Sequence, residues 1–279
     1  MLTLFDDSRF VFDAPIETLN PLKFDFSSVS AIFDCDSSIN APGIIYFILK
    51  FMKNLPFISI LIPTTPNRLK FLTQLFKCIK KQDYLGKKEI IVLNDGNKEL
   101  KNIPIQDNTE YRLINLKTEN TIGHKRNLLN EEAKGDVLIY FDDDDYHFPT
   151  RISHTVEKLK NGNNLIAGSS KSFVFNTLNK RIYEYGPYGK NHSGAGSMGF
   201  FKEYGKNHKF DEFKKNAEES SFTNNFTEPM TQLDAEKTIL VIFHENNTFD
   251  KKLSTKTNLS IYQKDYFLTN NNDLKFYDN

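Results

Sequence analysis

The sequence predicts an α/β protein with a mixed, mostly parallel sheet flanked by helices. Short apolar runs rich in β-branched residues occupy 58–62, 89–93 and 137–141, and helical patterns lie between them. This order of strands and helices is typical of βαβ units, which build parallel sheets. Polar clusters directly follow these three runs, at the strand ends where such sheets bind ligands.

The first elements have the clearest pattern. Residues 57–63 form an apolar strand that ends at Pro63, and 69–79 repeat apolar residues at helical spacing with lysines between them. Cys78 borders this apolar stripe, and we expect a buried thiol there. Residues 89–93 form a second strand, which the turn sequence at 94–97 closes.

The later elements follow with weaker periodicity. They are expected as a strand at 111–116, a helix at 123–133, a strand at 137–141, a hairpin at 173–175 and 181–185, and a strand at 239–243. Residues 1–42 show no sustained period, and a short helix is expected from about 44 to 53.

Composition excludes several classes of protein. The 279 residues carry 36 Lys and Arg against 36 Asp and Glu, a balance that argues against a dedicated nucleic-acid binder. Two cysteines cannot form a disulfide framework, so a reducing compartment is expected. Residues 1–10 lack the pattern of a secretory signal, and lysines, Asn54 and Pro56 interrupt the most apolar window, 44–62. We therefore expect a soluble, cytoplasmic protein without a transmembrane segment.

Four consecutive aspartates, residues 142–145, follow the strand at 137–141. Like charges in contact raise each other's pKa, so four carboxylates in a crevice need a counter-charge. A divalent cation supplies one, and carboxylates are the ligands that Mg²⁺ and Mn²⁺ prefer. A solvated acidic loop is the alternative, but an apolar strand and the segment 146–149 enclose this run. A metal at this position suggests a site that handles a diphosphate.

Two basic residues, Lys125 and Arg126, begin the helix just before the acidic strand. The N-terminus of that helix favours an anion, and Gly123 allows close approach to it. This placement favours a role at a diphosphate over that of a solvated helix surface.

These residues together resemble family 2 nucleotide-sugar glycosyltransferases, which are inverting enzymes of the GT-A fold. The resemblance rests on the order and spacing of several motifs and is continuous over about 57–152, becoming weaker to about 252. The motifs are Ile58-Ser-Ile-Leu-Ile-Pro63, Asn67-Arg68, Glu89-Ile-Ile-Val-Leu-Asn-Asp-Gly-Asn97, Gly123-x-Lys-Arg-Asn127, Ala133-x-Gly135 and Phe141-Asp-Asp-Asp-Asp-Tyr-x-x-Pro149.

The resemblance implies a nucleotide-sugar site made by residues that follow successive strands. Thr64 and Thr65 would line the nucleoside pocket, and Asp95 or its neighbour Asn94 would hydrogen-bond the base. The family more often has two acidic residues at this pair, so the assignment within it stays open. The implied binding set is Pro63, Thr64, Thr65, Arg68, Asn94, Asp95, Lys125, Arg126, Asp142 and Asp143.

The family's Asp-x-Asp motif aligns with residues 142–144. Asp142 would face the ribose or the sugar and Asp144 the metal, whereas the role of Asp145 stays open. Many such enzymes have a third metal ligand in a late segment, and His244 ends the strand at 239–243. Imidazole suits Mn²⁺ beside oxygen ligands. The resemblance therefore implies Mn²⁺, or Mg²⁺, bound by Asp144 and His244.

Two further regions match the family's catalytic and acceptor positions. A Glu-Asp pair usually supplies the base; here the pair is Glu218-Glu219, where Glu219 aligns with the base and Glu218 is the alternative. A solvated pair at a helix start is the other interpretation. The glycine-containing loop at 194–199 resembles the acceptor-side loop, with Gly196, Ser197 and Met198 as contacts.

The expected function is metal-dependent, inverting transfer of a sugar from a UDP-sugar to a hydroxyl acceptor, either a glycan or a protein-linked one. A nucleotide-sugar-binding relic without turnover and a sugar nucleotidyltransferase are the alternatives. We expect residues 1–55 to form an N-terminal extension, 56–252 the single catalytic domain, and 253–279 a tail packed on it.

Overall fold

A computed structural model describes residues 2–4, 10–12, 54–104, 109–214, 217–244, 261–262 and 275–278. The chain divides into two compact units, Met1–Leu55 and Pro56–Asn279. In the first, the strands β1 (Leu2–Leu4) and β2 (Phe10–Phe12) pair antiparallel. The helix expected at 44–53 lies outside the described residues. Among the residues searched, no helix is long and apolar enough to cross a bilayer.

The second unit is built on a seven-stranded, mostly parallel sheet, as the sequence predicts. Strands β6, β3, β4 and β5 run parallel, β11 pairs antiparallel with both β6 and β8, and β12 runs parallel to β8. In sheet order the strands are β12 (Thr231–Gln232), β8 (Ile166–Gly168), β11 (Gly199–Phe201), β6 (Val137–Tyr140), β3 (Ile58–Thr64), β4 (Lys88–Asp95) and β5 (Arg112–Leu116).

A second sheet of five strands follows the order β14-β10-β9-β13-β7. Strands β9 and β10 form the antiparallel hairpin expected from the sequence, and β13 runs parallel to β9. The strands of this sheet are β7 (Tyr146–His147), β9 (Ser172–Asn176), β10 (Arg181–Tyr185), β13 (Ile239–Phe243) and β14 (Ile261–Tyr262).

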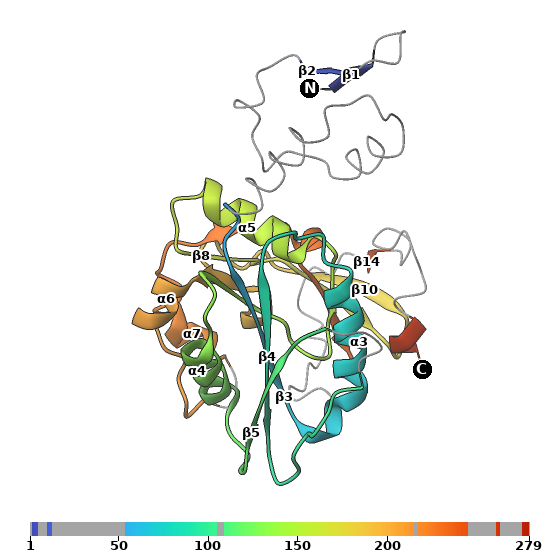
Figure 1. Cartoon of the computed structure of the whole chain (residues 1–279), viewed down its shortest axis with the longest axis vertical. Helices are drawn as coiled ribbons and strands as arrows, with labels where there is room; N and C mark the ends of the chain where they lie inside the picture. Colours follow the sequence, from blue (N-terminus) through green and yellow to red (C-terminus); the bar gives the residue numbers. More distant parts are fainter. Residues whose placement is uncertain are drawn as a thin grey trace. The chain divides into compact units, whose positions relative to one another are not determined.

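Helices lie on both sides of strands β3, β4 and β5 in Figure 1, with α3 to one side and α4 to the other. Helix α3 buries Phe71, Cys78 and most of its other apolar residues while its lysines are exposed, so the expected buried thiol is confirmed. The helical segments are η3 (Pro66–Arg68), α3 (Leu69–Lys80), α4 (Ile122–Glu132), α5 (Arg151–Asn161), η4 (Ala195–Ser197), α6 (Lys202–Asn207), α7 (Glu219–Phe222), η5 (Ala235–Lys237) and η7 (Lys275–Asp278).

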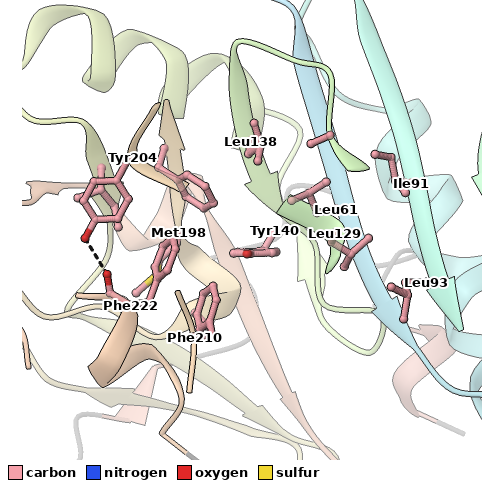
Figure 2. Packing of buried hydrophobic residues seen from close by; sticks show 14 of the residues in the cluster. Leu61, Ile91, Leu93, Leu129, Leu138, Tyr140, Met198, Tyr204, Phe210 and Phe222 are labelled. Carbon is pink, nitrogen blue, oxygen red and sulfur yellow. Dashed lines mark hydrogen bonds between the residues drawn. The ribbon is translucent and has the colours of Figure 1, made fainter. Parts of the chain in front are cut away.

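An aromatic cluster packs α4 and the segments around α6 and α7 against the central sheet (Figure 2). Phe210 stacks on Phe222 with ring centroids 4.1 Å apart, and Tyr140 contacts Phe210 edge-on at 5.8 Å. The Tyr204 hydroxyl donates a hydrogen bond of 2.9 Å to the Phe222 carbonyl. This packing fixes α7 beside the end of β6, because Phe222 and Tyr140 share one core.

Strands β3, β4 and β6 are parallel neighbours, so their carboxyl ends meet at one edge of the sheet. Thr64 ends β3, Asp95 ends β4, and the acidic run follows β6. Crevices at such an edge are where parallel sheets bind ligands.

Candidate active site

The middle two aspartates of the acidic run, Asp143 and Asp144, form ion pairs with Arg68 of η3. Arg68 Nη1 donates to Asp143 Oδ1 at 2.5 Å and lies 3.0 Å from Asp144 Oδ2. Thr64 Oγ1 donates to the other Asp143 oxygen at 2.6 Å. Asp143 is 2% exposed; burial and Asp144 raise its pKa above the usual range, while Arg68 and Thr64 oppose that shift.

The expected metal pair comes together across 100 positions of sequence. His244 Nε2 lies 3.2 Å from Asp144 Oδ2, and the imidazole stacks on Phe71 with ring centroids 4.6 Å apart. Phe71 belongs to α3 and is buried, so α3 holds the imidazole against the carboxylate. A carboxylate and an imidazole are suitable donors for Mn²⁺.

The described residues do not place three or more His, Cys, Asp or Glu side chains together as a metal-binding group. Asp144 and His244 thus fit a cation whose remaining ligands come from a substrate or water. The counter-charge argument drawn from the sequence needs correction, because arginines already face the aspartates. Arg68 pairs with Asp143 and Asp144, and Arg126 pairs with Asp142.

Arg126 is a buried bridge between the acidic run and α7. Its side chain is 4% exposed; Nη2 lies 3.0 Å from Asp142 Oδ1, and Nε lies 3.2 Å from Glu218 Oε1. The guanidinium lies over the Tyr140 ring at 4.6 Å, and its Nη1 is buried without a partner. Burial lowers the pKa of Arg126, but Asp142 and Glu218 outweigh it, so the group stays charged. The structure thus joins Arg126 to two carboxylates, where the sequence predicted a contact with a diphosphate.

Glu219 begins α7 and lines the same cavity as Asp142 and Arg126. This cavity has a volume of about 290 Å³. Burial raises the pKa of Glu219 above its ordinary value, and the negative charge of Glu218 adds to the shift. No cation pairs with Glu219 within the described part of the chain, whereas Glu218 is held by Arg126. Glu219 is therefore the carboxylate of the pair that is suited to accept a proton in the cavity.

Lys125 connects the ends of β3 and β4 from inside the protein. Its Nζ donates to the Thr64 carbonyl at 3.1 Å and to Asp95 Oδ1 at 2.9 Å, and the side chain is 7% exposed. The other Asp95 oxygen accepts a hydrogen bond from the Asn120 backbone at 2.7 Å. Lys125 thus orients Asp95 and does not point into solvent as a free cation.

Asn94 is fully buried and ties down the loops beyond β4. Its Nδ2 donates to the Lys98 carbonyl at 3.1 Å and to Asn115 Oδ1 at 2.8 Å. Its Oδ1 is buried without a partner. The pair predicted to bind a base therefore consists of an internally bonded amide and a carboxylate paired with Lys125.

The N-terminus of α4 is occupied by the protein itself. Thr121 caps the helix by accepting from the His124 backbone at 3.2 Å, and its hydroxyl donates to the Glu212 carbonyl at 2.6 Å. A Cβ on Gly123 would collide with the Asp211 carbonyl oxygen. The glycine expected to admit an anion instead admits the 210–212 loop.

The predicted acceptor-side residues divide between cavity and core. Gly196 and Ser197 line the cavity, and a Cβ on Gly196 would collide with Asp142 Oδ2. Met198 is 0% exposed in the aromatic cluster, and its carbonyl accepts from Arg151 Nη2 at 3.0 Å. Met198 therefore supports the cavity wall from behind, where the sequence predicted a contact with the acceptor.

The other predicted binding residues belong to β3 and its end. Pro63 lies within the buried strand, and the Thr65 carbonyl accepts from the Arg68 backbone at 3.0 Å. Several further cavity residues come from the second sheet and its loops, where the sequence carries no motif that predicts them. These include Ser169, Ser170, Lys171, Ser172, Tyr188 and His192.

Asp145, whose role the sequence left open, also lines the cavity. Its carboxylate accepts a hydrogen bond from a strand of the second sheet. Oδ1 accepts from the Ile242 backbone at 2.9 Å, and the Asp145 carbonyl accepts from the Tyr277 hydroxyl at 3.1 Å. Asp145 thus joins the acidic run to β13 and η7.

A mostly parallel sheet with an acidic run at its carboxyl edge and a carboxylate-lined cavity beside it is the architecture of a GT-A glycosyltransferase. The model of glycosyl transferase family 2 matches residues 59–222, more than half of the 279. This chain belongs to that family.

Solved structures of TarS 1–349 from S. aureus share the fold. One TarS 1–349 structure is 16% identical with a TM-score of 0.51, and the match covers 66% of this chain. In complex with UDP-GlcNAc the values are 17%, 0.52 and 69%, and in complex with UDP they are 18%, 0.50 and 67%. Each match spans 60% of that TarS chain. The curated proteins contain no match to this sequence.

Proposed function

We propose that this glycosyltransferase moves a sugar from a UDP-sugar to a hydroxyl acceptor, either a glycan or another hydroxyl compound, with inversion at the anomeric carbon. The observation that carries the proposal is that Asp142 and Glu219 line one cavity. Asp142 belongs to the acidic run at the sheet edge, and Glu219 lies on α7. Solved TarS structures with UDP-GlcNAc and with UDP support the choice of donor.

In this proposal Asp142 and Asp144 of the acidic run have different roles. Asp142, held by Arg126 and given room by Gly196, orients the donor sugar. Asp144 and His244 would hold Mn²⁺ or Mg²⁺, which would act as a Lewis acid toward the departing diphosphate. The half-buried Thr65 would line the nucleoside pocket, and the buried Thr64, Asn94 and Asp95 would support it from the ends of β3 and β4.

Glu219 supplies the base in this proposal. Its carboxylate takes the proton from the acceptor hydroxyl while the oxygen attacks the anomeric carbon. The bond between that carbon and the diphosphate oxygen breaks at the same time, and attack from the opposite face inverts the centre. Glu218 holds α7 against Arg126 and thereby keeps Glu219 in the cavity. We name Glu218 a positioning residue for this reason.

The test uses water as the acceptor, since hydrolysis of UDP-GlcNAc needs no knowledge of the natural one. The wild type with Mn²⁺ should release UDP and give β-GlcNAc first, observed by proton NMR before mutarotation. Glu219→Gln should lower the rate by about a hundredfold or more, the usual contribution of a general base. Glu203→Gln, a matched change on the exposed face of α6, should leave the rate unchanged.

The pH profile separates the two glutamates. Glu219 must be ionised to act, and its pKa is raised, so the rate should fall with acidity at a midpoint above the ordinary glutamate value. Glu218→Gln removes a negative neighbour and should move that midpoint to lower pH. An initial α-anomer would exclude inversion, and UDP-GlcNAc binding without turnover would favour the binding relic. A rate that survives complete removal of divalent ions by EDTA would exclude the metal.

A further inference from the structure

Arg68 contacts the acidic run at the point where the cation is proposed to bind. Its Nη1 donates to Asp143 Oδ1 at 2.5 Å and lies 3.0 Å from Asp144 Oδ2. The same Asp144 oxygen lies 3.2 Å from His244 Nε2. One carboxylate oxygen is thus shared by a guanidinium and by the imidazole of the proposed metal pair.

The two aspartates hold Arg68 in different ways. Asp143 is 2% exposed, and its second oxygen accepts from Thr64 at 2.6 Å, which fixes the carboxylate. Phe71 lies under the guanidinium at 6.0 Å from its ring centroid. Asp143 and Phe71 therefore give the guanidinium an anchor that does not depend on Asp144.

We propose that Arg68 competes with the divalent cation for Asp144 and thereby makes cation binding depend on the nucleotide diphosphate. The inference rests on the cation assigned to Asp144 and His244 under the proposed function. A cation on Asp144 Oδ2 lies beside Nη1, and two positive charges at that range repel each other strongly. The guanidinium therefore moves off Asp144 and stays on Asp143 when the cation binds.

A diphosphate changes this balance because it brings negative charge to the same place. Its oxygens attract the cation and the displaced guanidinium together, so cation and diphosphate bind cooperatively. By linkage, each ligand raises the affinity of the other by the same factor. Arg68 thus lowers the affinity for the cation alone and makes the two ligands bind as a pair.

The experiment measures the dissociation constant of Mn²⁺ by isothermal titration calorimetry and by the EPR signal of free Mn²⁺. Wild type, Arg68→Met and Arg68→Gln are compared without UDP; Gln keeps a donor for Asp143 and removes the charge. Both variants should bind Mn²⁺ about tenfold more tightly than wild type, within the usual range of coupling factors. The control is Arg112→Met, which removes an equal charge from an exposed ion pair with Glu132. Arg112 is the first residue of β5, at the opposite end of that strand from the carboxyl edge of the sheet, so its loss should leave the dissociation constant of Mn²⁺ unchanged.

A second titration in saturating UDP measures the cooperativity itself. The gain in Mn²⁺ affinity from UDP should be large in the wild type and at least about fivefold smaller in both Arg68 variants. Equal Mn²⁺ affinities of wild type and variants without UDP would overturn the inference, as would an unchanged gain. Neither result would touch the proposed transfer reaction, which is read from UDP-GlcNAc hydrolysis. If no protein bound Mn²⁺ even with UDP, the cation assignment and this inference would fall together.

Discussion

Replacing Arg126 with methionine tests how the buried charges around the cavity are held. The change keeps side-chain bulk over Tyr140 and leaves Asp142 and Glu218 without their shared cation. Glu218 is 9% exposed in its side chain and Asp142 is 26% exposed, so the orphaned Glu218 carries most of the cost. Removing one partner of a buried ion pair typically costs about 3–5 kcal/mol. We expect a loss of about 3 kcal/mol, at the lower end because Asp142 keeps part of its hydration.

The assay is urea unfolding of wild type, Arg126→Met, Glu218→Gln and the double variant. If the orphaned carboxylate causes the loss, the double variant should be more stable than Arg126→Met alone, because no buried charge is then unpaired.

Arg112→Met is the matched control. Its pair with Glu132 spans 2.7 Å, but the side chains are 37% and 49% exposed. Exposed pairs contribute about 1 kcal/mol or less. If Arg126→Met costs no more than this control, or if the effects of the two single changes simply add in the double variant, the bridge described above does not hold the cavity.

Two further changes test single contacts. Gly196→Ala places a methyl group against Asp142 Oδ2 and should weaken UDP-GlcNAc binding about tenfold, as measured by calorimetry. The control is Gly189→Ala, whose added carbon has its nearest neighbour 4.0 Å away, and it should bind UDP-GlcNAc as the wild type does. Equal affinities of the two variants would exclude the collision. Burial lowers the pKa of His147 to about 4, so it stays neutral when folded but is protonated below about 6.5 when unfolded, and stability falls with the pH between these values. His147 should therefore lower the free energy of unfolding of the wild type by about 2 kcal/mol between pH 7.5 and pH 5.0. Urea unfolding of His147→Gln should show a decrease over the same pH range that is smaller by this amount.

The strands could be predicted because strands that are buried in a parallel sheet have continuous apolar sequences. Residues 57–63 predict a strand that the structure has at Ile58–Thr64, and 239–243 predict Ile239–Phe243. The hairpin was predictable because two short segments rich in aromatic and β-branched residues, β9 and β10, are separated by turn residues. The cavity residues of the loops between 169 and 192 were not predictable, because nothing in their local sequence distinguishes a cavity wall from a surface loop.

Counter-charges could not be assigned from sequence alone. The acidic run does need positive partners, but a sequence does not tell whether a metal or an arginine supplies them. Arg68 is 75 positions from Asp143, and it reaches the run only because β3 and β6 are neighbours in the sheet. Gly123 illustrates the same limit, since only the folded chain reveals that a carbonyl from the 210–212 loop takes the space above it.

The two glutamates at the start of α7, the N-cap Glu218 and the first helical residue Glu219, have different partners in the fold although the sequence gives no reason to distinguish them. Glu218 and Glu219 are adjacent carboxylates at a helix start, and the helix N-terminus favours both equally. In the fold both glutamates line the cavity, but the Glu218 carboxylate forms an ion pair with Arg126, whereas Glu219 has a raised pKa. A base must be ionised and still have appreciable affinity for a proton, and only a carboxylate without a paired cation meets both conditions. The ion pair of Glu218 is therefore the reason why we propose Glu219 as the base, and the proposal does not require an aspartate at that position.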